Sequence, residues 1–570
     1  MQTARRLYLY VMSGVTLAVI AVGLAILLEV AIGSLGIFDR ASYGYYASSQ
    51  ERLSQAIAML GVGIPVWAIH WRLAQRGIAR AGIEGGADRG SAVRAFYLTI
   101  ALAISLVVWV TGAADSLRAL VLQASGVGGD VFTVDPVGAA SRTIVALLVW
   151  LYHGTVRRSD LRSAEVHGAA AWIPRLYLYG VSLAALWAAI EGIGTLASSL
   201  LQAPRVGFEI DYALVDVING TVGLVAWGLV WAGHWRYATR LAAAGDWRGQ
   251  AEQASRTRLA AFIASIVVAA GFATSGLADV ISALIASQLP NDPDLGVYTS
   301  PAGPAVAVVV PLAITIPWAL AWWAHTRWLS REPAAAEPLR ALHQARLETH
   351  GVSMIALALG ATAFAWLLGL VIDVAFGGNR TAETYGLPWT YQVAQWLPMA
   401  VVGLAVWAWQ WTRVRGRRRH SPTDEANSTI RRTFLYLTLA GALVAALGSA
   451  AVILYRLVGS ALGAGLAGDA VSELSTPLGV LITAGIGIAY HGLLLRSDQA
   501  LRLVPVAEAP PATPRAGVPP TAPEHMTTTP ASASLRRFEL VAPDGGDVEA
   551  ALEAARAGLP DGFTLREITG

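Results

Sequence analysis

The stretch Gly63-Ile64-Pro65-Val66-Trp67-Ala68-Ile69-His70-Trp71-Arg72 ends a long apolar run with tryptophan, histidine and arginine. A Trp-x-x-His pair recurs along the chain, at Trp67/His70, Trp150/His153, Trp231/His234 and Trp322/His325. The series continues with Trp407/Gln410, where glutamine replaces histidine, and closes at His491, with Ile488 in the tryptophan position. Successive members stand 81 to 91 residues apart. A period of this size indicates one helical hairpin copied six times.

Composition places these hairpins in a membrane. The chain has 570 residues, of which 55% are hydrophobic and only 14% charged, more apolar than a water-soluble domain needs. All 41 basic residues are arginine, so chemistry that requires lysine, such as Schiff-base formation or a Walker-type phosphate loop, is excluded. The absence of cysteine excludes disulfides, thiol nucleophiles and iron-sulfur clusters.

We therefore predict an all-α polytopic membrane protein with twelve transmembrane helices arranged as six hairpins. The first span, which follows Arg5 and Arg6, is interpreted as a retained signal anchor because its apolar core is too long for a cleaved signal peptide. The N-terminus and the loops after every second span hold 27 arginines, whereas the alternate loops hold six. This bias predicts cytoplasmic N- and C-termini and external alternate loops.

The hairpins alternate between two kinds. Hairpins 1 and 3 open with Arg-Leu-Tyr-Leu-Tyr, at 6–10 and 175–179, whereas hairpins 2 and 6 end with Arg-Ser-Asp, at 158–160 and 496–498. The larger unit is therefore a four-helix module present three times. We predict modules at 1–165, 170–332 and 345–500.

The chain resembles a bacterial family of four-helix membrane domains of unknown function, which often occur in tandem. The residues that carry the likeness are Arg-Arg-Leu-Tyr-Leu-Tyr at 5–10 and Gly-Ile-Pro-Val-Trp-Ala-Ile-His-Trp-Arg-Leu-Ala-Gln-Arg at 63–76. Hairpin 5 departs most, with His350 interpreted as standing where an arginine opens the other hairpins and with Gln410 in place of histidine. The resemblance implies a fold and a location in the bacterial cytoplasmic membrane, but no activity, cofactor or catalytic residue.

The recurrent Trp and His residues have a structural and a functional interpretation. As a structural belt they would lie at the headgroup level beside long arginine side chains. A metal or haem site would need two imidazoles that converge on one ion, and no span has paired histidines one turn apart. Roles in lipid-headgroup binding or proton sensing stay open because imidazole titrates near neutral pH. We favour the belt and predict no metal site and no cofactor.

A second set of polar residues lies inside the spans. Glu191 is flanked by apolar neighbours, Arg142 lies about two turns past Pro136, and Asp216 and Asn219 open the sixth span. A charge in the hydrocarbon region is costly unless it is paired or solvated, so these four residues form the candidate intramembrane site. A structural ion pair between Arg142 and Glu191 is the alternative interpretation.

The C-terminal region is different in kind. Residues 503–533 are rich in Pro, Ala and Thr and are predicted to be a flexible linker. Residues 534–570 are predicted to form a small cytoplasmic β-α-β piece that docks on the arginine-rich cytoplasmic face, pairs with a copy of itself or binds a protein partner.

Two functional hypotheses follow. The first is a non-enzymatic scaffold or sensor built from tightly packed modules. The second is a secondary transporter or channel with a polar path near Arg142 and Glu191. A membrane enzyme ranks third, because we find no nucleophile motif and no paired carboxylates in one span. The arginine loops favour anionic lipid headgroups as partners and not nucleic acid.

Overall fold

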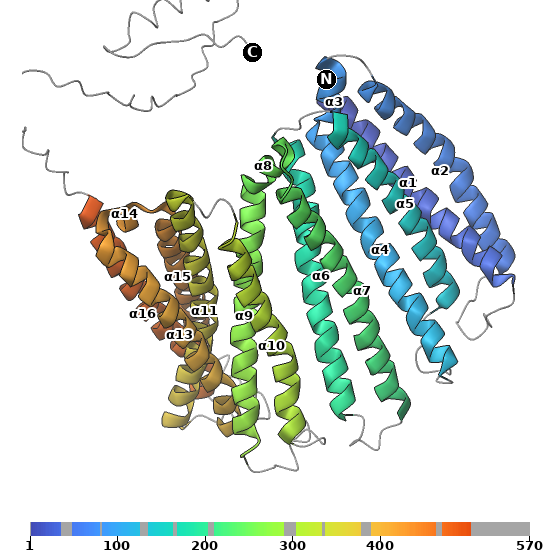
Figure 1. The fold of residues 1–570 in the computed structure, drawn as a ribbon. Helices are drawn as coiled ribbons and strands as arrows, with labels where there is room; N and C mark the ends of the chain where they lie inside the picture. The colour runs from blue at the N-terminus through green and yellow to red at the C-terminus, as the bar shows by residue number, and fades with distance from the viewer. Residues whose placement is uncertain are drawn as a thin grey trace, which may run out of the picture. The chain divides into compact units, whose positions relative to one another are not determined.

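The computed structural model describes residues 2–35, 48–79, 83–125, 135–163, 168–202, 210–289, 304–332, 337–377, 389–462 and 470–502. These residues are almost entirely helical (Figure 1). The long helices are α1 (Gln2–Gly33), α2 (Ser49–Ile78), α4 (Ala92–Ala124), α5 (Pro136–Ser163), α6 (Ala169–Gln202), α7 (Ile210–Ala242), α9 (Arg256–Ala286), α10 (Pro304–Leu329), α11 (Pro338–Ala375), α13 (Trp389–His420), α15 (Thr429–Ala461) and α16 (Ala470–Arg502). Three short helices stand between them, α3 (Ile83–Arg89), α8 (Trp247–Gln253) and α14 (Pro422–Asn427).

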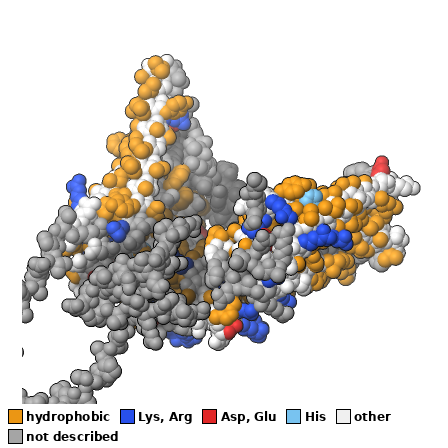
Figure 2. All heavy atoms as spheres, turned by 90° about the horizontal axis from the view of Figure 1, so that it is seen from above, with side chains coloured by type: hydrophobic (Ala, Val, Ile, Leu, Met, Phe, Trp, Pro, Cys, Tyr) orange, Lys and Arg blue, Asp and Glu red, His pale blue; other side chains and the backbone are white. Residues whose placement is uncertain are grey.

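All twelve long helices are long and apolar enough to cross a membrane, within the part of the chain that the structure describes. This confirms the prediction of twelve spans and of a multi-pass membrane protein. Hydrophobic side chains cover much of the helix surface visible in Figure 2, and arginines gather in patches between them. Such a surface suits helices that contact lipid on several sides.

Each module repeats the same packing of its four long helices. In the first module α1 packs along α2, α4 packs along α5, and α1 also contacts α4 and α5. In the second module α6 packs along α7, α9 packs along α10, and α6 also contacts α9 and α10. In the third module α11 packs along α13, α15 packs along α16, and α11 also contacts α15 and α16. The short helix of each module connects the second long helix to the third.

Close approach between helices depends on small residues. A Cβ atom added to Gly192 would lie 2.6 Å from the backbone nitrogen of Leu224, and one added to Gly220 would lie 2.6 Å from that of Leu196. In the third module, Gly360 and Gly403 bring α11 and α13 equally close. Backbone contact of this kind is how membrane helices associate without a hydrophobic driving force between them.

Neighbouring modules contact each other through the third helix of one and the first two helices of the next. These contacts are α4 with α6 and α7, and α9 with α11 and α13. Trp150 Nε1 donates a hydrogen bond of 3.1 Å to the Tyr177 hydroxyl across the first interface, and a Cβ added to Gly271 would lie 3.1 Å from Ile355 across the second. The second module thus lies in contact with both others.

The chain divides into two compact units, residues 1–505 and 506–570. The predicted linker at 503–533 and the predicted β-α-β piece at 534–570 lie outside the described residues.

Candidate functional site

Each module places an ion pair between its first long helix and its short helix. Arg6 Nε lies 2.5 Å from the Asp88 carboxylate, Arg175 Nε lies 2.7 Å from Glu252, and Arg346 Nη2 lies 2.9 Å from Glu425. The acidic partners come from α3, α8 and α14 in turn. The short helices therefore have a common role, since each carries an acid back to the start of its module.

A second ion pair in each module joins the start of the third helix to the C-terminal end of the fourth, or, for Glu332, to the residues just after it. Arg94 binds Asp160 through Nε and Nη2 at 2.7 and 3.0 Å, and both side chains are buried, 2% and 7% exposed. The equivalent pairs are Arg258 with Glu332 and Arg431 with Asp498. Two-pronged guanidinium-carboxylate contacts are stronger and more directional than single ones. They hold the ends of the second hairpin together.

Local sequence positions these arginines. A serine three residues earlier caps each helix, and its hydroxyl accepts a hydrogen bond from the arginine backbone N–H. The caps are Ser91, Ser255 and Ser428 for Arg94, Arg258 and Arg431. A Ser-x-x-Arg pattern thus ends each loop and begins each third helix.

In the first two modules a tyrosine hydroxyl binds the arginine of the second ion pair. Tyr10 accepts a hydrogen bond of 2.9 Å from Arg94. Tyr179 accepts one of 2.8 Å from Arg258 and donates one of 2.6 Å to Glu252, so its hydroxyl bridges the two pairs of the second module.

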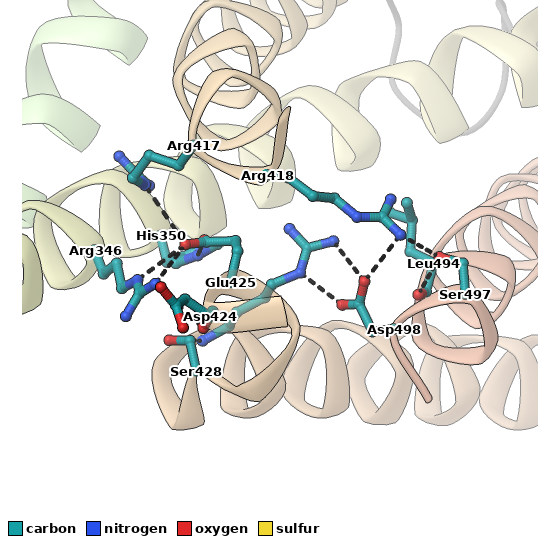
Figure 3. A network of polar contacts seen from close by, with 11 residues as sticks. Arg346, His350, Arg417, Arg418, Asp424, Glu425, Ser428, Leu494, Ser497 and Asp498 are labelled. Atoms are coloured by element: carbon teal, nitrogen blue, oxygen red, sulfur yellow. Dashed lines mark hydrogen bonds and ion pairs between the residues drawn. The ribbon is translucent and has the colours of Figure 1, made fainter. Parts of the chain in front are cut away.

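The third module has histidine in this place (Figure 3). Arg346, and not His350, corresponds to Arg6 and Arg175, because Arg346 binds the short-helix acid. The interpretation of His350 as a replaced arginine is therefore wrong: it replaces the tyrosine four residues further on. Nε2 of His350 lies 3.8 Å from Glu425, beyond hydrogen-bond distance, and Nη1 of Arg431 has no partner among the described residues.

Glu425 is the acid on which this cluster converges. It lies in α14, outside the membrane-spanning segments. Burial alone would raise the pKa of its carboxyl group, but the guanidinium groups of Arg346 and Arg417 outweigh that effect and hold the pKa below its ordinary value. Glu425 therefore stays ionised at neutral pH and holds α14 against the start of α11.

The recurrent histidines share one hydrogen-bond pattern. Each Nδ1 lies 2.7–2.9 Å from the backbone carbonyl four residues earlier, in His70, His153, His234, His325 and His491. A carbonyl only accepts, so Nδ1 carries the proton in all five rings. In the first two modules Nε2 meets a tyrosine hydroxyl at 3.0–3.2 Å, with His70 on Tyr8, His153 on Tyr97 and His234 on Tyr177.

Three of these rings lie inside the modules, whereas His70 and His234 are half-buried. His153, His325 and His491 are almost fully buried, as is Gln410, whose Oε1 accepts a hydrogen bond of 3.3 Å from Arg413. The described residues contain no group of three or more His, Asp or Glu side chains that could hold a metal ion. Hydrogen bonding to their own helices and to tyrosine accounts for the pattern.

The tryptophans of the pattern pack beside them. Trp67 and Trp407 stack on the tryptophans one turn later, at centroid distances of 6.0 Å. Trp150 and Trp231 pack in the interface of the first and second modules, and Trp322 packs in the interface of the second and third. They serve helix and module contacts at a common level of the repeat.

The four intramembrane candidates are only partly brought together. Glu191 and Asp216 line one open pocket of about 320 Å³, between α6, α7 and α10. Arg142 is exposed on α5 and Asn219 is half-buried on α7, and neither lines this pocket. Glu191 accepts a hydrogen bond of 3.1 Å from Trp187, and no ion pair joins it to Arg142 among the described residues.

The acids of the ion pairs were not singled out from the sequence. Their signal was present as a repeat: an acid 77 to 82 residues after the arginine that opens each module, and another 66 to 74 residues after the arginine of each Ser-x-x-Arg pattern. Comparison of the three copies with each other, and not of the hairpins alone, would have found both.

Comparison with known families gives one result. A family described as Domain of unknown function (DUF5671) matches residues 6–152, 175–320 and 346–486, one match in each module. No curated protein and no solved structure matches the chain significantly.

Proposed function

Because the chain belongs to the DUF5671 family, in three tandem copies and with no function attached to the domain, we propose from the structure that it is a non-enzymatic membrane scaffold or sensor. The observation that carries the proposal is the pair of arginine-acid contacts repeated in every module. The recurrent charged groups bind each other, which makes each module a rigid unit. Few of these charged groups are then left for chemistry on a substrate.

The alternative, a secondary transporter or channel, draws support from the pocket lined by Glu191 and Asp216. A polar path was expected to include Arg142 as well, but Arg142 lies outside the pocket. This weakens the alternative.

A flux measurement distinguishes the two proposals. We expect proteoliposomes of the full chain to pass protons, potassium and small osmolytes no faster than empty liposomes. A flux that is present in the wild type, lost in Glu191→Gln and kept in Asp279→Asn would overturn the scaffold proposal. Asp279 is a suitable control because it is an exposed acid of the same module that does not line the pocket.

We further propose that the chain lies in a bacterial cytoplasmic membrane with both termini inside and with anionic lipids against its arginine-rich end. Because the chain has no cysteine, single cysteines can report its topology without background. Ser330→Cys, after α10, should react with an impermeant maleimide only in opened cells, and Gln288→Cys, after α9, should react in intact cells. The reverse pattern would invert the proposed orientation.

A further inference from the structure

The pocket of the second module is the strongest site outside the ion-pair clusters. Glu191, Thr195, Ser198 and Ser199 come from α6, Asp216 from α7, and Val310 and Ile314 from α10. Glu191, Thr195 and Asp216 are exposed, so a ligand can reach them. All of them belong to helices that can cross a membrane.

The first module shows what occupies the corresponding place there. Gly23 and Gly192 mark equivalent positions, since each brings the first helix of its module close to the second. Six residues after these glycines come Glu29 in the first module and Ser198 in the second, so these two positions correspond. On the second helices, Arg52 and Asp216 correspond, because each comes 18 residues before the recurrent histidine of its helix. In the first module Arg52 Nη2 lies 2.5 Å from Glu29.

The second module has therefore replaced an internal arginine-acid pair by an acid and a hydroxyl. The side chain at the place of Arg52 is now the carboxylate of Asp216, and Glu191 adds a second carboxylate to the same pocket. Its polar lining consists of carboxylates and hydroxyls, which favour a ligand that donates hydrogen bonds and carries positive charge. A carboxylate inside a membrane span is costly unless a cation accompanies it.

We propose that this pocket binds an organic cation with an ammonium or guanidinium group, in the place that the Arg52 guanidinium fills in the first module. The pocket volume of about 320 Å³ accommodates such a group. A metal ion is a poorer fit, because the described residues bring together no three acidic or histidine ligands. The cation can come from an aminolipid headgroup or from a water-soluble amine. This inference does not depend on the scaffold proposal, since binding requires no flux.

The test uses the full chain in nanodiscs of phosphatidylglycerol, with two arms. In the lipid arm, phosphatidylethanolamine is added and the lipid bound per chain is counted by native mass spectrometry. In the soluble arm, butylguanidinium is titrated by calorimetry. We expect one bound ligand per chain in at least one arm, and the arm that responds identifies the source.

Variants assign any binding to the pocket. Asp216→Asn and Glu191→Gln should each weaken it about tenfold or more, as the loss of a charge-assisted hydrogen bond implies, whereas Asp279→Asn should not. The double variant Ser198→Glu/Asp216→Arg restores the pair found in the first module. It should remain folded and lose binding. Equal binding in this double variant and the wild type, or no binding in either arm, would overturn the proposal.

Discussion

Asp160→Ala should lower the free energy of unfolding by about 3–5 kcal/mol, because it leaves the buried Arg94 guanidinium without its counter-charge. Among the described residues, Arg94 would retain only Tyr10 as a side-chain hydrogen-bond partner. Denaturation of the full chain in detergent, followed by tryptophan fluorescence, measures the effect. The first module should unfold before the other two.

The chain offers a matched control in the outer ion pair of the same module. Arg6 and Asp88 are 21% and 24% exposed, so solvent screens their interaction, and Asp88→Ala should cost about 1 kcal/mol or less. A second control replaces both buried partners: Arg94→Leu/Asp160→Leu should recover much of the stability lost in Asp160→Ala, because no buried charge is left unpaired. Equal losses in Asp160→Ala and Asp88→Ala would show that burial does not set the strength of these pairs.

The sequence predicted the helices and the threefold repeat because both leave local marks. A span of about 20 apolar residues and a recurring Trp-x-x-His at its end can be recognised without any knowledge of contacts. The short helices α3, α8 and α14 left no such mark, since they have only six or seven residues and interrupt polar loops. The role of their acids is evident only when the fold brings them to arginines 77 to 82 residues away.

The candidate intramembrane site illustrates the same limit. Position along a span followed from counting residues, and two of the four residues chosen in this way, Glu191 and Asp216, line one pocket of the second module. The direction in which a side chain points did not follow, because a span that is apolar on all sides has no polar face to orient it. Arg142 was therefore grouped with residues from which it is separate.

The misassigned histidine has a related cause. His350 was aligned by its position at the start of an apolar span, whereas the contacts align Arg346 with Arg6 and Arg175. In the third module the polar residues Glu348, Thr349 and His350 stand between Arg346 and the apolar run, so the start of that run and the first ion pair do not coincide. Ion-pair partners, and not hydropathy, define equivalent positions in these repeats.

Gly220→Leu should lower the free energy of unfolding by about 3 kcal/mol or more, a loss second to that of Asp160→Ala. A Cβ at this position would lie 2.6 Å from the Leu196 backbone nitrogen and 3.0 Å from the Gly192 carbonyl oxygen. Both obstacles are backbone atoms, which cannot turn aside as a flexible side chain can. The two helices must separate, and the contact along α6 and α7 is lost.

Gly228→Leu is the control for this prediction, because it introduces the same side chain into the same helix. Nothing lies within 4 Å of a Cβ at Gly228, and leucine favours helix more than glycine does, so stability should be unchanged or slightly higher. Equal losses in the two variants would contradict the close-approach explanation.

Gly220 also lies one turn from Asp216, so separation of α6 from α7 should move Asp216 away from Glu191. Under the proposed cation site, Gly220→Leu should therefore abolish binding, and Gly228→Leu should preserve it.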